Sequence, residues 1–503
     1  MNSLLALRGP RPIWVGTAAA TVVLLSLLLL YTSRLQTTTS RVITPDHVKH
    51  IVTDPTYVDV SSTQGNLNTI NVDAKLVHDV SQYFIDFPLQ PPYKDHFGEL
   101  GQRTRVLRDW LISADESQDP ATKTLLMNAV ERVAVSLYPF LEKPNRQNIT
   151  QGRVADLRAS FEPGSAGIVI PTSNKTLRFA AHLIGSLRSV LKSTLPIQVV
   201  YAGDNDLTPD SRERLSQLVE SGPPLEFLDI LTVFDDSTLQ LQSGGWAIKA
   251  FAALGSRFER VILADADAVF FQQPEVLLDH EAFVRTGALL FHDRLLWPGA
   301  FKERHEWWES QIRQPSPALN ISLVWTEWYA EEGDSGLVVL DKSRMDIFTG
   351  LFHIGWQNSY SVREETTYKI TYGDKETWWF GLELVGAGYE FSDHYGGIVG
   401  WPQLDDKGRQ KVCSFVIAHV DAKGRLLWYN GSLLKNKGKS DMADVYEVPT
   451  NWMIDAEWQK GATKQDMSCM VGGEMRNLTQ EELGVMDRSI ELAKILDAKI
   501  HPA

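Results

Sequence analysis

Two aspartates one residue apart are the strongest chemical signal in this sequence of 503 residues. Asp265 and Asp267 follow a short apolar run at residues 261–263, which is typical of a strand buried on both faces. Two carboxylates beside a buried strand are costly to remove from water unless a positive charge pairs with them. A divalent cation that prefers oxygen ligands, such as Mg²⁺ or Mn²⁺, would be a natural partner. The alternative is a pair of acidic turn residues without a metal.

The sequence around these aspartates alternates between strand and helix patterns. Apolar runs predict strands at residues 167–171, 197–201, 227–234, 287–291, 336–340 and 416–420. Helical spacing of apolar residues predicts helices at 177–191 and 247–258. Such alternation is typical of an α/β fold with a parallel, helix-covered sheet. Ligands bind such a sheet beyond the carboxyl ends of its strands, where the two aspartates are expected.

The remaining stretches of the globular part carry other patterns. Helical spacing of apolar residues predicts a helix over 125–141 that Pro144 ends. Residues 298–325 are irregular and rich in Trp, so we expect a loop over the site. Thr479 and Glu482 have the spacing of a capping box at the start of a last helix.

Composition limits the classes of partner. The chain has 49 Lys and Arg against 63 Asp and Glu, a net charge of −14, which argues against a nucleic-acid partner. Its 15 Trp mildly favour carbohydrate, because indole rings stack on sugars.

An uncharged, apolar run of 19 residues at 13–31 has about the length that spans a bilayer. We expect an uncleaved single-pass anchor there, because a cleavage site is not clear. Five Asn-x-Ser/Thr sequons, which follow the anchor at 148, 174, 320, 430 and 477, place the catalytic part in the lumen. The expected organisation is a cytoplasmic tail (1–12), the anchor (13–31), a stem (32–102), a helical lead-in (103–160) and a catalytic domain (161–503).

Cys413 and Cys469 are the two cysteines. In an oxidising lumen we expect them to form a disulfide, with two buried free thiols as the alternative.

Five blocks in this order resemble the fungal Golgi α-mannosyltransferases that extend N-glycan outer chains and related glycans. The blocks are residues 245–250, 262–275, 287–294, 334–344 and 373–381, and the resemblance covers roughly 167–429. It implies a GT-A type (Rossmann-like) nucleotide-sugar transferase fold, a GDP-mannose donor, a Mn²⁺ cofactor and an α-mannosidic product. One block departs from the family, which more often has Glu where this chain has Asp334.

The resemblance also suggests roles for single residues. It implies that Asp267 binds the metal and that Asp265 binds the metal or the ribose of the donor. His419, after an apolar run, is the candidate third ligand, with a core histidine as the alternative. Lys249 would reach the diphosphate or a catalytic carboxylate, unless it is simply solvated.

Further candidates would contact the nucleotide or the acceptor. Backbone N–H groups in the turn that begins with Pro171 and Thr172 could hold the nucleotide. Retention at the anomeric carbon needs a carboxylate nucleophile or attack on the face that the phosphate leaves. The carboxylates inside the matched blocks are Asp334, Asp374 and Glu376. Each of them could be a nucleophile, a contact to the acceptor hydroxyl or a member of a structural ion pair. Asp374 could also pair with Lys375 or Arg363 on the surface. Stacking on acceptor sugar or burial in the core are the options for Trp378, Trp379 and Trp401.

The expected protein is therefore a retaining type II mannosyltransferase of the Golgi membrane. It would move mannose from GDP-mannose to a mannosyl acceptor on a glycan, with an α-1,3 linkage favoured over α-1,2. Its partners would be the nucleotide sugar, the glycan and the membrane, with Golgi mannosyltransferase complexes as a further option. The alternatives are a glucosyl- or galactosyltransferase that uses a UDP-sugar, and a catalytically silent glycan-binding membrane protein.

Overall fold

The computed structural model describes residues 72–142, 151–218, 222–438, 445–463 and 465–500. The expected tail and anchor, and all of the expected stem before residue 72, lie outside these ranges. No helix among the described residues is both long and apolar enough to cross a bilayer.

The centre of the protein is a seven-stranded mixed sheet in the order β3-β2-β1-β4-β7-β6-β8. Its strands are β1 (Glu162–Pro171), β2 (Ile197–Tyr201), β3 (Glu226–Asp229), β4 (Phe258–Ala264), β6 (Ala288–His292), β7 (Gly333–Asp341) and β8 (Glu390–Phe391). β1 to β4 run parallel, as expected, but β7 runs antiparallel to both β4 and β6. β6 and β8 again run in the direction of β1 to β4, so the prediction of a parallel sheet is wrong for β7 alone among these seven strands. A strand buried on both faces has the same apolar pattern in either direction.

Alternate residues of β4 face two different cores, as the two-residue period of a strand requires. Val261 and Leu263 pack with α9 (Ile248–Gly255), α14 (Met345–Gln357) and α17 (Thr377–Val385). Ile262 and Ala264 lie in the core on the opposite face, which α7 and α18 cover. These two helices are α7 (Leu177–Gly185) and α18 (Gln480–Ile500). Helices thus cover both faces of the sheet. A ligand is therefore expected at the carboxyl ends of the strands.

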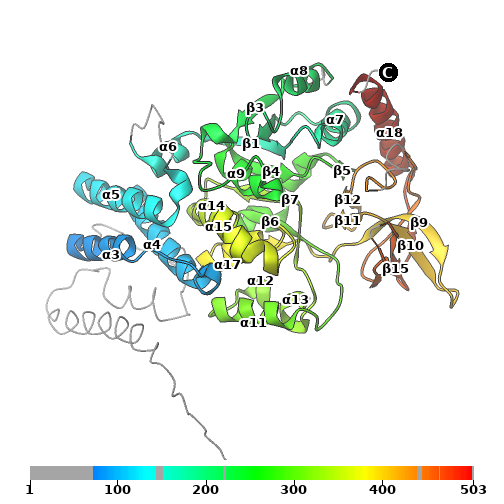
Figure 1. The fold of residues 1–503 in the computed structure, drawn as a ribbon. Coiled ribbons are helices and arrows are strands. Elements are labelled where there is room, and N and C mark those ends of the chain that lie inside the picture. Colours follow the sequence, from blue (N-terminus) through cyan, green and yellow to red (C-terminus); the bar gives the residue numbers. More distant parts are fainter. Residues whose placement is uncertain (1–71, 143–150, 219–221, 439–444, 464, 501–503) are drawn as a thin grey trace, which may run out of the picture.

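The helical lead-in begins earlier than the expected boundary at residue 103. It comprises α3 (Ala74–Asp86), α4 (Phe97–Glu116), α5 (Pro120–Leu137) and α6 (Arg153–Ala159), on one side of the sheet in Figure 1. The buried face of α4 includes Arg103 and Arg108, which hide its apolar period. α5 ends at Leu137 and not at Pro144, because Pro139 already excludes a further helical residue before it.

Residues 298–325 are mostly helical and packed, so the expected loop over the site is wrong. They contain α11 (Lys302–Gln311), α12 (Pro317–Asn320) and most of α13 (Leu323–Glu327). Trp307 packs edge-on against Phe97 of α4, with ring centroids 5.0 Å apart, and Trp308 packs against Trp379 of α17. The Trp residues of α11 therefore join this segment to the helical core.

Residues 398–477, together with β5, form an antiparallel β region on the other side of the molecule (Figure 1). One sheet has the order β11-β12-β5, with β5 (Ala268–Phe270), β11 (Ile417–Val420) and β12 (Leu426–Asn430). A six-stranded sheet contains β9 (Ile398–Leu404), β10 (Gln410–Ser414), β13 (Asn451–Met453), β14 (Glu457–Gln459), β15 (Ser468–Val471) and β16 (Arg476–Asn477). Because β5 directly follows Asp267, its pairing with β12 brings late residues of the chain to the aspartate pair.

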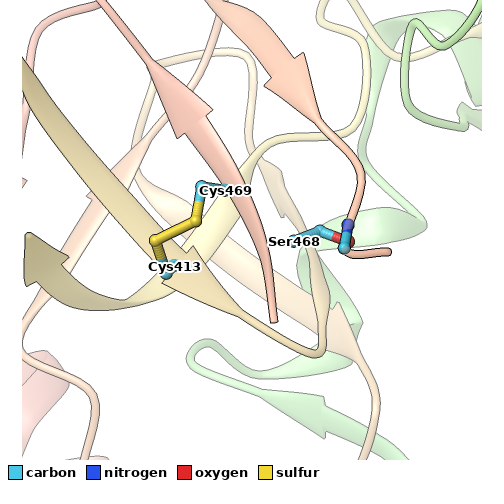
Figure 2. The surroundings of a disulfide bond; sticks show 4 residues. Cys413, Ser468 and Cys469 are labelled. Atoms are coloured by element: carbon cyan, nitrogen blue, oxygen red, sulfur yellow. A yellow bond between two sulfur atoms is a disulfide. The ribbon is translucent and has the colours of Figure 1, made fainter. Parts of the chain in front are cut away.

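The capping box of the last helix is confirmed. The Thr479 N–H donates to Glu482 Oε2 over 2.7 Å, and the Glu482 N–H donates to Thr479 Oγ1 over 3.2 Å. The disulfide is confirmed as well. Figure 2 shows Cys413 of β10 joined to Cys469 of β15. The two residues lie directly opposite one another in the antiparallel pair.

We predict that the unreduced, denatured protein contains no reactive thiol and that reduction releases two. The bridge spans 56 positions, and closing a loop of that size stabilises by roughly 4 kcal/mol in the chain-entropy model. Urea unfolding with and without reductant measures this contribution. A Cys413→Ser, Cys469→Ser double variant is the control, because reductant should not change its unfolding. Two thiols in the unreduced protein would contradict the bridge.

Candidate active site

The ammonium of Lys249 lies at the centre of the site. Lys249 lies in the first turn of α9 and is only 3% exposed. Its Nζ is 2.9 Å from Asp265 Oδ1 and 3.1 Å from Asp374 Oδ2, and it donates to the carbonyl oxygen and hydroxyl of Ser335. One buried cation thus joins the end of β4, the strand β7 and the turn before α17. The alternative of a solvated Lys249 is wrong.

Charges in this cluster depend on one another. Burial opposes the charge of Lys249, but Asp265 and Asp374 outweigh it and raise the pKa of the lysine. Burial raises the pKa of Asp265, as do Asp374 and Asp334, while Lys249 opposes the rise. Because burial and neighbouring carboxylates disfavour the ionised form of Asp265, a second positive charge nearby would stabilise that form.

His419 and Asp334 form a buried pair beside this cluster. His419 Nε2 lies 3.1 Å from Asp334 Oδ2, and the imidazole stacks on Trp428 of β12. Asp334 Oδ1 accepts hydrogen bonds from the Asn430 side chain and the Gly336 N–H. Burial would raise the pKa of Asp334, but the bond to His419 and the charges of His419 and Lys375 hold it well below its usual range. Asp334 therefore stays ionised and fixes the imidazole.

The carboxylate of Asp267 pairs with Lys437, from the segment after β12. The backbone carbonyl of Asp267 accepts the Ser432 N–H over 2.7 Å, which holds this segment against the start of β5. The site therefore has two lysines, one on each aspartate of the pair. The sequence prediction did not assign Lys437, Ser335 or Asn430 to the site. Ser335 lies in a matched block, and Asn430 was noted only as a sequon.

The predicted metal ligands are not assembled as a group. Nowhere in the described ranges do three His, Cys, Asp or Glu side chains stand together as a metal-binding set. The donor chemistry nevertheless fits a divalent cation. Among the described residues, the buried Nδ1 of His419 has no hydrogen-bond partner, while its Nε2 faces a carboxylate. A carboxylate on the second ring nitrogen is the usual arrangement of a histidine that binds metal through the first.

We predict that Asp334→Asn lowers the affinity for Mn²⁺ by about 10- to 100-fold, because it removes the charge that orients His419. Loss of the free Mn²⁺ signal in electron paramagnetic resonance measures binding without any need for activity. Asp341→Asn, at the far end of β7, is the matched control and should bind like the parent. Equal Mn²⁺ affinity in Asp334→Asn and the parent would show that Asp334 does not act through the metal.

The turn after β1 does not offer the N–H groups that the sequence suggested. The Thr172 N–H donates to the Val200 carbonyl, the Ser173 N–H to Thr176 Oγ1 and the Asn174 N–H to the Asp206 carbonyl. Pro171, the last residue of β1, has no N–H. Each N–H carries one proton, so a nucleotide at Pro171 and Thr172 would have to use other atoms. This part of the prediction is not supported.

Asp374 and Glu376 are buried, at 2% and 1% exposure. Asp374 Oδ2 accepts from the Trp378 indole as well as from Lys249, so the option of a surface pair with Lys375 or Arg363 is wrong. Glu376 Oε1 accepts the N–H groups of residues 332 and 333, and its Oε2 accepts the Trp379 indole N–H. Burial, with help from Glu331, raises the pKa of Glu376 to about 8. Glu376 therefore supports the start of β7, and no contact ties it to reacting groups.

The tryptophans of α17 belong to the core, so the stacking option does not hold for Trp378 and Trp379. Trp401 of β9 is half-buried, and its indole N–H donates to the Val448 carbonyl. Lys435 Nζ lies 4.8 Å from the centroid of its ring. Trp401 thus packs within the antiparallel β region.

Fold and site together define an α/β protein with an acidic, lysine-paired site at the carboxyl end of a central strand. The family model described as "Mannosyltransferase putative" matches residues 165–421, which is more than half of the chain, and the protein belongs to this family.

Relatives found by sequence comparison are named as mannosyltransferases. Alpha-1,3-mannosyltransferase MNT3 of Saccharomyces cerevisiae is 28% identical over 290 residues, covering 51% of this chain and 44% of that protein. Alpha-1,3-mannosyltransferase MNT2 of the same yeast is 27% identical over 311 residues, covering 55% and 53%. The match thus spans about half the length of these relatives.

Solved structures show weaker likeness. A galactosyltransferase, LgtC, in complex with donor and acceptor sugar analogues has 14% identity and a TM-score of 0.30, covering 45% of this chain and 73% of that chain. Core-mannan synthase A from Aspergillus fumigatus, in its Mn/GDP form, has 11% identity and a TM-score of 0.28, covering 50% and 74%. The family model that matches residues 165–421, not these structures, carries the family assignment.

Proposed function

We propose that this protein is a retaining α-mannosyltransferase of the GT-A type. It transfers mannose from GDP-mannose to a mannosyl acceptor on a glycan, with an α-1,3 linkage favoured. The observation that carries the proposal is the pair Asp265 and Asp267 at the end of β4, each held by a lysine, within the matched family region. The names of the curated relatives support the sugar and the linkage.

Residues of this chain would prepare the leaving group. Asp265, Asp267 and His419 Nδ1 would hold a divalent cation, which supplies a Lewis acid for the departing diphosphate. Lys437 is the more exposed of the two lysines, with 38% of its side chain accessible. It can exchange its carboxylate for a diphosphate oxygen, whereas Lys249 is fixed by four acceptor atoms. Lys437 therefore binds the leaving group, and Lys249 keeps the carboxylates in place.

The contacts of the three candidate carboxylates limit the routes to retention. Asp334 and Glu376 use both oxygens for internal contacts, whereas the Trp378 indole and the Lys249 ammonium both contact Asp374 through Oδ2. A nucleophilic carboxylate needs a free oxygen at the anomeric carbon. Asp334 and Glu376 therefore have no oxygen to offer as a nucleophile. The contacts of Asp374 within the described residues leave its Oδ1 unengaged, so we infer that retention proceeds either through Asp374 or by attack of the acceptor hydroxyl on the face that the diphosphate leaves.

The test is transfer by the purified full chain, with Mn²⁺, from a panel of GDP-mannose, UDP-glucose and UDP-galactose to α-linked mannobiose. We expect a mannosyl product from GDP-mannose alone. Asp267→Asn should lower this transfer by several orders of magnitude, because the charge on the departing diphosphate is no longer neutralised. Asp341→Asn is the matched control and should keep parental rates.

Other outcomes identify the rival functions. Transfer from UDP-glucose or UDP-galactose would identify the protein as a glucosyl- or galactosyltransferase. Mannoside binding without hydrolysis of any donor would favour the silent glycan-binding protein. Parental transfer by Asp267→Asn, in a protein that ignores chelator, would refute the metal site.

We also propose a single-pass type II placement in the Golgi membrane. Support comes from the sequence alone: the uncharged run at 13–31 and the five sequons that follow it. Association with other Golgi mannosyltransferases would fit this placement.

This placement predicts that the protein resists alkaline carbonate extraction. Its glycans should be removable by endoglycosidase only after the membrane is opened, because a lumenal domain is shielded by the bilayer. Immunoblots of sealed and detergent-treated microsomes measure this. A soluble protein that begins near residue 37 would point to cleavage instead.

A further inference from the structure

Two exposed aromatic rings lie in contact next to the buried charge cluster. Trp246 is 48% exposed and Tyr372 is 53% exposed, and their ring centroids are 5.4 Å apart at an interplanar angle of 46°. Trp246 precedes Lys249 by three residues, and Tyr372 precedes Asp374 by two. Since Lys249 and Asp374 are ion-paired, the chain brings the two rings to one place at the rim of the site.

The backbone fixes this pair. Gly373 has φ +66°, in the left-handed region that favours glycine, and a Cβ there would lie 2.7 Å from Trp246 Cε3. The indole therefore rests directly on the Gly373 backbone. Gly245 has φ +56°, although a Cβ there would meet nothing within 4 Å. The residue directly before Trp246 is thus also in the left-handed region that favours glycine.

The exposure of these rings costs free energy that the fold does not recover. Burial of an aromatic side chain is favourable, and tryptophans elsewhere in the matched region, such as Trp378 and Trp379, are buried. A single exposed aromatic is ordinary. Two in contact, both set by left-handed glycines and both beside site residues, form a binding surface for a ligand with an apolar face.

Charges near the rings select the kind of ligand. Lys375 Nζ lies 5.8 Å from the Tyr372 centroid, but it is paired with Asp293 and lies 3.6 Å from Glu331. Its charge is thus already neutralised, so an anionic ligand gains little here. A neutral pyranose fits instead, because its C–H face packs on an aromatic ring and its hydroxyls can reach polar groups. The rings also face open solvent, as a ligand that extends beyond the site requires.

We propose that Trp246 and Tyr372 form the platform that binds the terminal, uncharged mannose of the acceptor glycan. This rests on the proposed function and adds the acceptor subsite to it. The donor occupies the side of Asp265 and Asp267, and the acceptor stacks on the side of Asp374. The tilt between the rings lets one ring pack on the sugar face while the other covers its edge.

The experiment measures acceptor binding and acceptor KM on the full chain in detergent. Saturation-transfer NMR with α-linked mannobiose reports binding without turnover. Trp246→Ala should weaken binding and raise the acceptor KM by about tenfold, Tyr372→Ala by a similar or smaller factor, and Trp246→Phe should restore most of the loss. Phe87→Ala removes an aromatic of similar exposure from the helical lead-in and should behave like the parent. Melting temperatures check that each variant folds, as the exposure of these side chains implies.

The outcomes separate this inference from the proposed function. If the parent transfers mannose and Trp246→Ala and Tyr372→Ala keep the parental KM and NMR signal, the platform is refuted while the function stands. If the parent transfers no mannose, yet mannobiose signals disappear in Trp246→Ala, the function is refuted and the mannose platform stands. If Phe87→Ala loses as much binding as Trp246→Ala, the effect is not local and the platform is also refuted.

Discussion

The buried ammonium of Lys249 is the interaction on which the rest of the site depends. It binds carboxylates from two elements that are more than a hundred residues apart, Asp265 after β4 and Asp374 before α17, and it also binds Ser335 of β7. A lone buried cation or carboxylate would be strongly unfavourable, so each group requires the others. The position of the turn that carries Tyr372 and Gly373 follows from the same pairing. The buried ion pair thereby fixes the position of the exposed turn next to it.

A second constraint is the return of the chain to β5. The aspartate pair ends β4, and the chain continues directly into β5, which pairs with β12. His419, Asn430 and Lys437 all come from this late hairpin or the segment after it, and each contacts an acidic residue of the site. The site is therefore shared between the mixed sheet and the antiparallel β region. Neither half holds the full set of charges alone.

The sequence indicated the parts of the fold that have a simple period. The strands of the parallel half, the capping box at Thr479 and the disulfide all follow from local patterns or from the count of cysteines. It did not indicate the direction of β7, because a fully buried strand carries no polar side to orient it. The start of the helical lead-in was placed too late, after α3 and the first turn of α4. The buried face of α4 includes Arg103 and Arg108, whose charges interrupt the apolar pattern although backbone carbonyls accept their hydrogen bonds. Patterns of neighbouring residues do not predict a helix whose buried charges are stabilised by partners far away in the sequence.

The candidate site likewise has features that the sequence predicted and features that depend on the folded chain. The spacing of Asp265 and Asp267 after an apolar run drew attention to the pair, and the resemblance to the family blocks added Lys249 and Asp334. Sequence could not separate a supporting carboxylate such as Glu376 from a reacting one, because that depends on whether its oxygens are already occupied. Nor could it choose among tryptophans: Trp246 and Trp378 differ in exposure, and exposure is a property of the folded chain.

The last helix has a consequence for synthesis of the protein. α18 packs on α7, and its Asp497 binds Arg178 and His182 of that helix from over three hundred residues away. During vectorial synthesis the first β-strands and α7 are complete long before α18 emerges. One face of the sheet must then stay incompletely covered for most of translation, with apolar surface that chaperones can bind. The sheet can reach its final packing only after α18 has emerged.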